Sequence, residues 1–196
     1  MGLTYANQLT ILRMAFIPCF VLLAIYGHPG AATLIFLLAG ITDGLDGYVA
    51  RKLKQRTLLG SYLDPMADKL LITAAFVTLS LPSVPFALHV PVWLTITSIS
   101  RDLLIALVAL ILHLLTGHSE FPPTFLGKCT TTAQLITVST ALLGNFLTKF
   151  TMAIFMPVVY STLLLTVASG LQYLKRSVSL IESYQRAVGT DDKQGG

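Results

Sequence analysis

Long apolar runs alternate with short polar breaks along the chain. A helix needs roughly 20 apolar residues to cross a bilayer. Six runs have about that length: 8–26, 31–50, 62–81, 91–115, 127–147 and 150–174. The pattern therefore predicts an all-α integral membrane protein with six transmembrane helices.

Glycine and proline mark most of the breaks between these predicted helices. The clearest clusters are "GHPG" at 27–30, "LPSVPFALHVP" at 81–91 and "TGHSEFPPTF" at 116–125. The last two helices have a weaker boundary, near Gly144 and Asn145. After the sixth run the sequence becomes polar, and we expect the end of the chain to fray after Val188.

Composition supports a membrane protein with one main domain. Hydrophobic residues make up 54% of the 196 residues, charged residues 11%, and the mean hydropathy is +0.75. We expect a six-helix membrane domain over 1–175 and a polar cytoplasmic tail over 176–196. The net charge of +4 fits loops that face anionic lipid and does not imply nucleic-acid binding. Cys19 and Cys129 lie in apolar runs without CxxC spacing, which predicts packing residues and no disulfide.

Basic residues predict the orientation. They cluster between the second and third runs and in the tail, at Arg51, Lys52, Lys54, Arg56, Lys175, Arg176, Arg186 and Lys193. Cytoplasmic loops are enriched in Lys and Arg, so six spans with both termini in the cytoplasm fit the bias. Arg13 interrupts the first run and no A-x-A cleavage site follows it, so we expect a retained helix and no secretory signal.

Acidic residues cluster in predicted membrane helices, where a charged side chain has a high free-energy cost. Of nine Asp and Glu residues, five fall within or at the edge of predicted helices: Asp43, Asp46, Asp64, Asp68 and Asp102. One acid at the centre of a membrane helix costs roughly 2.5–3.5 kcal/mol, and neighbouring acids also repel one another. The cluster at the cytoplasmic end of helices two and three therefore needs cations.

Helical spacing sorts this cluster into two faces. Asp43 and Asp46 share a stripe with Gly47 and Ala50, whereas Asp64 and Asp68 are four residues apart on the next helix. Carboxylates from two helices suit one or two Mg²⁺ or Mn²⁺ ions, which keep positions open for phosphate.

Small residues and one cation complete the predicted site. Gly47, Ala50 and Gly60 leave room for a bulky ligand, and Arg51 supplies positive charge for a phosphate. The sequence therefore predicts a metal–diphosphate site at a membrane surface. A structural ion site, a transporter's cation pathway or a membrane prenyltransferase are the alternatives, although the prenyltransferase needs a second Asp-rich motif and more spans.

The spacing of this cluster resembles the signature of the CDP-alcohol phosphotransferase family. The matching positions are Asp43-x-x-Asp46-Gly47-x-x-Ala50-Arg51, Gly60 after eight residues, and then Asp64 and Asp68 at intervals of four. The resemblance implies a homodimeric phosphatidyltransferase that uses CDP-diacylglycerol and releases CMP. It further implies that Asp43, Asp46, Asp64 and Asp68 hold metal, and that Asp68 is also the general base. The CDP site would then comprise Asp43, Asp46, Gly47, Ala50, Arg51 and Gly60.

Other segments resemble bacterial phosphatidylglycerophosphate synthases, which act in the cytoplasmic membrane. These segments are "NQLTILR" at 7–13, "GKCTTTAQL" at 127–135 and "LQYL" at 171–174. Glycerol 3-phosphate as acceptor needs basic groups, and Arg101 and Lys128 are the candidates.

Two departures favour another acceptor. Those synthases usually have Arg-Glu where this chain has Arg101-Asp102, and a second Lys where it has Thr130. "SRD" at 100–102 and "PTFLGK" at 123–128 look more like CDP-dependent cardiolipin synthases, whose acceptor is phosphatidylglycerol.

Structural interpretations also stay open for the basic residues. Arg101 and Asp102 are also consistent with an ion pair, or with separately partnered charges, that steady the fourth helix. Lys128 is also consistent with an interfacial lysine. Arg13 is expected near the substrate cavity or in a structural role, because an arginine within a membrane needs partners.

Overall fold

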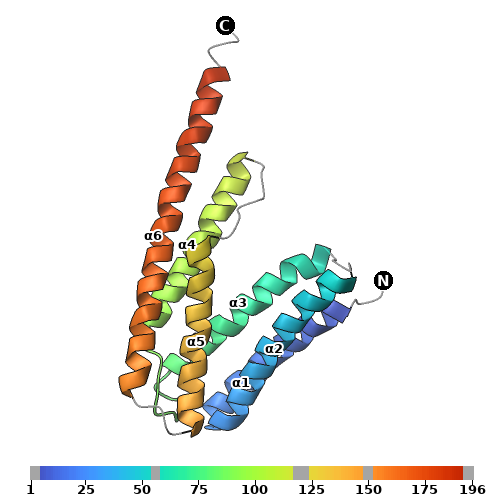
Figure 1. Cartoon of the computed structure of the whole chain (residues 1–196), viewed down its shortest axis with the longest axis vertical. Helices are drawn as coiled ribbons and strands as arrows, with labels where there is room; N and C mark the ends of the chain where they lie inside the picture. The colour runs from blue at the N-terminus through green and yellow to red at the C-terminus, as the bar shows by residue number, and fades with distance from the viewer. Residues whose placement is uncertain (1–4, 54–57, 117–123, 148–151, 192–196) are drawn as a thin grey trace. The chain divides into compact units, whose positions relative to one another are not determined.

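Six helices make up the part of the chain that the computed structural model describes (Figure 1). Their bounds are α1 Tyr5–Ile25, α2 Pro29–Leu53, α3 Leu58–Ser80, α4 Val92–Thr116, α5 Phe125–Leu147 and α6 Met152–Asp191. The structure describes the backbone of residues 5–53, 58–116, 124–147 and 152–191, and the side chains of 11–42, 67–111, 124–147 and 152–176. The expected all-α class and the number of helices are confirmed for this part.

The predicted helix bounds agree with the structure except at α6. This helix continues past the predicted end at 174 to Asp191. Residues 175–191 contain no proline, and they include Lys, Arg, Leu, Glu and Ala, which favour helices. The residues after 174 are mostly polar, so the apolar run ends there, but α6 continues as a helix.

The described chain divides into two compact units. Unit 1 comprises Met1–Thr95 and Gln134–Val159, and unit 2 comprises Ile96–Ala133 and Tyr160–Gly196. Helices α4, α5 and α6 each contribute residues to both units. The chain length had indicated one domain, and sequence alone gave no sign of this division.

Unit 1 has an apolar core built around α1. Helix α1 packs against α2 and α3 (Figure 1), and the rings of Phe20 and Phe36 lie 5.9 Å apart. The turn between α1 and α2 requires Gly27, whose φ of 75° suits the residue after a helix end. A Cβ on Gly27 would lie 2.8 Å from Pro85, so the proline-rich segment between α3 and α4 packs against this turn.

Asn145 on α5 holds that proline-rich segment against α5 within unit 1. Its Oδ1 accepts hydrogen bonds from the backbone N–H groups of Ala87 at 2.7 Å and Leu88 at 2.9 Å. Its Nδ2 donates to the carbonyls of Leu88 at 2.9 Å and Ala141 at 2.8 Å. Asn145 therefore connects two segments and lies within α5, two residues before the end of this helix at Leu147.

Unit 2 is polar inside and apolar outside. Its buried residues, among those with described side chains, are Ser98, Arg101, Thr124, Thr130, Thr162, Thr166 and Ser169. Large apolar side chains such as Leu103, Leu107, Leu164 and Leu171 are exposed. In this unit the side chains that would face lipid are apolar, and the helices contact one another through polar groups.

Two described segments are long and apolar enough to cross a membrane. They are Val92–Ile111 of α4 and Met152–Arg176 of α6. Ile11–Ile25 of α1 and Pro29–Thr42 of α2 are the apolar parts of two further helices that lie within the described side chains. The expectation of a membrane protein is therefore supported at two of the six predicted spans.

Candidate functional site

Helices α2 and α3 are joined by a short connection, and the helix bounds give the distance of each signature aspartate from that connection along its helix axis. Only four residues separate Leu53, at the end of α2, from Leu58, at the start of α3 (Figure 1). At a rise of about 1.5 Å per residue, Asp43 and Asp68 each lie about 15 Å from the connected ends. Asp46 lies about 10 Å and Asp64 about 9 Å from those ends. Asp43 and Asp68 therefore lie at about the same distance from the connection between α2 and α3. Asp46 and Asp64 form a second such pair, nearer to the connection.

Asp68 is the one signature aspartate whose side chain falls within the described part. It is half-buried on α3, next to the fully buried Ala67. The other predicted site residues lie in helices α2 and α3, but their side chains are outside the described residues: Asp43, Asp46, Gly47, Ala50, Arg51, Gly60 and Asp64. Within the described side chains, no three acidic, histidine or cysteine residues gather as a metal site.

The chemistry of these donors fits Mg²⁺ or Mn²⁺. All four are carboxylates, and hard oxygen ligands are those that both ions prefer. Matched levels on two connected helices also allow ligands from both sides of one site. The metal therefore stays a prediction that rests on the donor set and the helix bounds.

Arg13 lies inside unit 1. Its side chain on α1 has no exposed surface, so it does not face lipid. An arginine is rarely so deeply buried without a specific role, because its charge must be compensated. The structure thus agrees with the expectation that Arg13 points into the protein.

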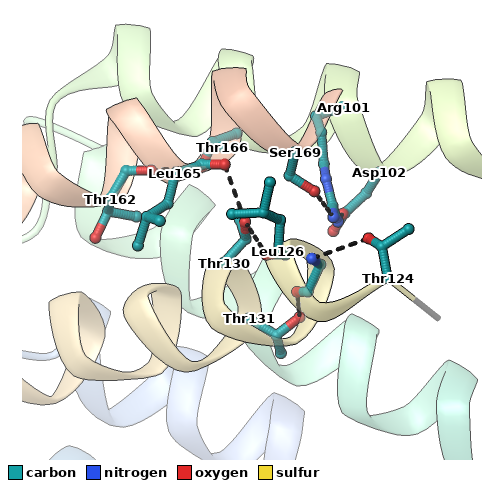
Figure 2. A network of polar contacts seen from close by, with 11 residues as sticks. Arg101, Asp102, Thr124, Leu126, Thr130, Thr131, Thr162, Leu165, Thr166 and Ser169 are labelled. Carbon is teal, nitrogen blue, oxygen red and sulfur yellow. Dashed lines mark hydrogen bonds and ion pairs between the residues drawn. The ribbon is translucent and has the colours of Figure 1, made fainter. Parts of the chain in front are cut away.

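Arg101 is the centre of a polar network in unit 2 (Figure 2). The side chain is 8% exposed, and its Nη1 donates to Asp102 Oδ1 at 2.7 Å. Its Nη2 donates to Ser169 Oγ on α6. The ion pair that we considered from sequence therefore exists, and a second helix also holds the guanidinium.

Lys128 lies near this network at the start of α5. Thr124 caps the helix, because its Oγ1 accepts from the Gly127 N–H at 3.1 Å. A Cβ on Gly127 would lie 3.3 Å from Arg101 Nη2. Arg101 therefore packs against the residue that precedes Lys128, whose side chain is exposed. Both candidate acceptor residues come from adjoining parts of unit 2.

Thr130 has a packing role that changes the meaning of the missing lysine. Its side chain is fully buried, and its hydroxyl contacts the carbonyls of Leu126 at 2.8 Å and Leu165 at 3.1 Å (Figure 2). Positions 128 and 130 differ by about 200° around a helix. Thr130 therefore faces α6, and its lack of charge removes no cation from the face that carries Lys128.

An open groove of about 370 Å³ runs between α4 and α6 within unit 2. Arg101 lines it together with apolar residues that include Ile96, Leu104 and Leu171. Sequence reasoning missed Ser169, which is fully buried and holds Arg101. The available signal was a Ser-Gly pair at 169–170 within an apolar run, in a protein with an intramembrane arginine that needs a partner.

Residues 3–171 match the family described as CDP-alcohol phosphatidyltransferase. The chain belongs to this family. The match includes all of α1 to α5 and most of the apolar part of α6. All eight signature positions fall inside it. Family membership confirms the resemblance that the aspartate spacing indicated, and it makes phosphatidyl transfer the activity class.

Individual relatives of this phosphatidyltransferase share most of its length. A CDP-diacylglycerol–glycerol-3-phosphate 3-phosphatidyltransferase of Haemophilus influenzae is 37% identical, covering 90% of this chain and 95% of the relative. The enzyme of the same name from Bacillus subtilis is 35% identical, with 87% and 93% coverage. A putative cardiolipin synthase of Mycobacterium tuberculosis is 36% identical, over 73% of this chain and 66% of the relative.

Proposed function

We propose that this phosphatidyltransferase moves the phosphatidyl group of CDP-diacylglycerol to glycerol 3-phosphate. The observation that carries the proposal is the near-complete coverage of relatives with that named activity, at 37% and 35% identity. The products are phosphatidylglycerophosphate and CMP. The acceptor hydroxyl oxygen forms a bond to the phosphorus that carries the diacylglycerol, and the bond from this phosphorus to the CMP oxygen breaks.

The signature residues have three roles in this reaction: they bind metal, bind the CDP group and remove the proton of the acceptor. Asp43, Asp46, Asp64 and Asp68 would hold Mg²⁺ or Mn²⁺, which supplies charge neutralisation for the diphosphate. The CDP group would lie against Asp43, Asp46, Gly47, Ala50, Arg51 and Gly60. Asp68 takes the proton of the attacking hydroxyl as general base. Its half-buried position on α3 supports this role, because a base must be reachable yet held in place.

Arg101 and Lys128 are assigned to the acceptor. Glycerol 3-phosphate carries a compact dianionic phosphate, and a guanidinium can bind phosphate oxygens with two parallel hydrogen bonds. Support comes from the contact between Arg101 and Gly127 at the start of α5, next to Lys128. An ordinary lipid-facing arginine would not have these neighbours.

Membrane topology completes the proposal. We infer six spans with both termini in the cytoplasm, the aspartates at the cytoplasmic end of α2 and α3, and a homodimer. The two long apolar segments of α4 and α6 support the spans, and the basic residues at 51–56 and 175–176 support the orientation.

Cardiolipin synthesis from phosphatidylglycerol is the second candidate. The similarity to the putative cardiolipin synthase of Mycobacterium tuberculosis favours it. Its sequence identity of 36% is close to the 37% and 35% of the two relatives above. A cation transporter, the alternative from another class, does not agree with membership in a transferase family.

The test supplies purified protein with CDP-diacylglycerol and one acceptor, and measures CMP. We expect release with glycerol 3-phosphate, loss of release in EDTA, and recovery with Mg²⁺ or Mn²⁺. Release only with phosphatidylglycerol would replace the proposed acceptor. Release that is unaffected by chelation would contradict the metal assignment.

A further inference from the structure

We propose that Ser169 and Gly127 are positioning residues that fix the Arg101 guanidinium for the acceptor's phosphate and so set acceptor affinity. The inference rests on the proposed function, because it takes Arg101 to contact the acceptor. It adds two residues, one on α6 and one on α5, that the signature of the family does not include. Both would act through Arg101 and neither would touch the reacting atoms.

Two hydrogen bonds from different helices hold the guanidinium. Adjacent residues on a helix point about 100° apart, so the Arg101 side chain bends to reach Asp102 on its own helix. Ser169, fully buried on α6, accepts from the other terminal nitrogen (Figure 2). With Asp102 alone the guanidinium could rotate about its contact, whereas a second anchor on another helix fixes its plane.

Gly127 leaves the space that the guanidinium occupies. A Cβ at this position would lie 3.3 Å from Arg101 Nη2 and 3.1 Å from Thr124 Oγ1, closer than side-chain carbons usually approach. Gly170 offers a contrast on the opposite side of Arg101. A Cβ there would lie 3.7 Å from Arg101 Cγ, which is an ordinary contact. A side chain at position 127 would therefore press on the guanidinium, whereas one at position 170 would make an ordinary contact.

The anchored guanidinium keeps donors for a ligand. Arginine has five N–H donors, and the contacts to Asp102 and Ser169 use one on each terminal nitrogen. The Nε–H is buried and has no hydrogen-bond partner among the described residues, so the donors left for a ligand are the remaining N–H groups of the two terminal nitrogens. Arg101 also lines the groove between α4 and α6, so part of the side chain borders open space. A guanidinium held in one orientation loses less conformational freedom when it binds phosphate.

The decisive measurement is Ser169→Ala in the full-length protein, with CMP release measured against each substrate in turn. We expect KM for glycerol 3-phosphate to rise about tenfold, in line with the loss of a hydrogen bond to a charged group. We expect kcat and KM for CDP-diacylglycerol to stay within about twofold, because the donor site lies in other residues. Ser169→Thr, which keeps the hydroxyl, should restore acceptor KM.

Matched variants separate positioning from general damage. Thr166 is equally buried on α6, but its hydroxyl donates at 2.7 Å to Thr162 of the same helix. Thr166→Val should therefore leave acceptor KM unchanged. Gly127→Ala should raise acceptor KM, whereas Gly170→Ala should not. The glycine pair provides a second test if Ser169→Ala does not yield folded protein.

The outcomes distinguish this inference from the proposed function. An equal rise in KM for both substrates, or an unchanged acceptor KM in Ser169→Ala and Gly127→Ala, overturns the positioning role. Should the unmodified protein use only phosphatidylglycerol, the proposed acceptor is wrong. The same variants are then measured with phosphatidylglycerol, which also presents an anionic phosphate. A selective rise in its KM supports the positioning role, and no rise overturns it.

Discussion

Unit 1 and unit 2 differ in the side chains that they bury, although both bury polar groups such as Arg13 in unit 1 and Arg101 in unit 2. Every buried hydrophobic residue with a described side chain belongs to unit 1, among them Phe20, Phe76 and Leu142. The buried residues described in unit 2 are threonines, serines and Arg101. Apolar packing therefore contributes most in unit 1, which also has hydrogen bonds such as those of Asn145, and hydrogen bonds between helices contribute most in unit 2.

This contrast separates two tasks within one chain. Close-packed interiors are rigid and sensitive to small changes in volume, which suits a hairpin that must keep carboxylates at fixed levels. A polar interior can orient a charged side chain such as Arg101, at a modest gain in stability per hydrogen bond. We therefore expect substitutions in unit 1 to affect turnover and stability strongly, and those in unit 2 to change substrate affinity more selectively.

The largest effect is expected for Asp68→Asn in unit 1. Loss of the general base should lower the rate of CMP release by about 100-fold or more, while the amide keeps the size of the side chain and CDP-diacylglycerol binding. Rate and binding are measured on the same protein preparation. Asp102→Asn in unit 2 is the control and should retain most of kcat; normal turnover by Asp68→Asn would show that the base lies elsewhere.

Phe76→Ala tests the close-packed core of unit 1. Phe76 is 1% exposed, and its truncation should lower the free energy of unfolding by about 3–5 kcal/mol. Val77, the next residue on α3, is 42% exposed, so Val77→Ala should cost much less. Thermal unfolding in detergent gives both values. Similar losses for the two variants would mean that burial does not decide stability in this unit.

Asn145→Ala removes the residue that fastens the proline-rich segment. Four hydrogen bonds are lost, and unsatisfied backbone groups remain, so we expect a loss of about 2 kcal/mol. Hydrogen exchange at the Ala87 and Leu88 amides should become faster. Thr140→Ala on the same helix removes only a bond to the Ile136 carbonyl and should leave these amides protected. Unchanged exchange in Asn145→Ala would show that another contact holds the segment.

The smallest effect is expected for Thr130→Val in unit 2. The substitution keeps the shape of the side chain and removes the contact from α5 to the Leu165 carbonyl on α6. Such bonds contribute about 0.6 kcal/mol on average in a membrane protein, and unfolding in detergent should show a loss near that value. Thr131→Val removes only a bond to Gly127 within α5 and should have less effect. A loss as large as that of Phe76→Ala would erase the contrast between the units.

Local signals explain which features the sequence could predict. Apolar run lengths and the Gly-Pro breaks located α1 to α5 within a few residues, and the intervals between aspartates indicated the family. The end of α6 was missed because a helix can continue after its apolar face ends. The burial of Thr130 against α6 could not be predicted, because the direction in which it points depends on how α5 packs against α6. The partnership of Arg101 with Ser169 could not be predicted, since the two residues are 68 apart in the chain.

That separation also has a consequence in time. At a synthesis rate of about 5–20 residues per second, Arg101 is made about 3–14 s before Ser169 exists. Asp102 is added immediately after Arg101, and its carboxylate can neutralise the guanidinium throughout this interval. A charge-compensated pair enters an apolar environment at lower cost than a lone arginine. During synthesis, Asp102 would thus neutralise Arg101 by itself until α6 has been made and Ser169 can accept the second hydrogen bond.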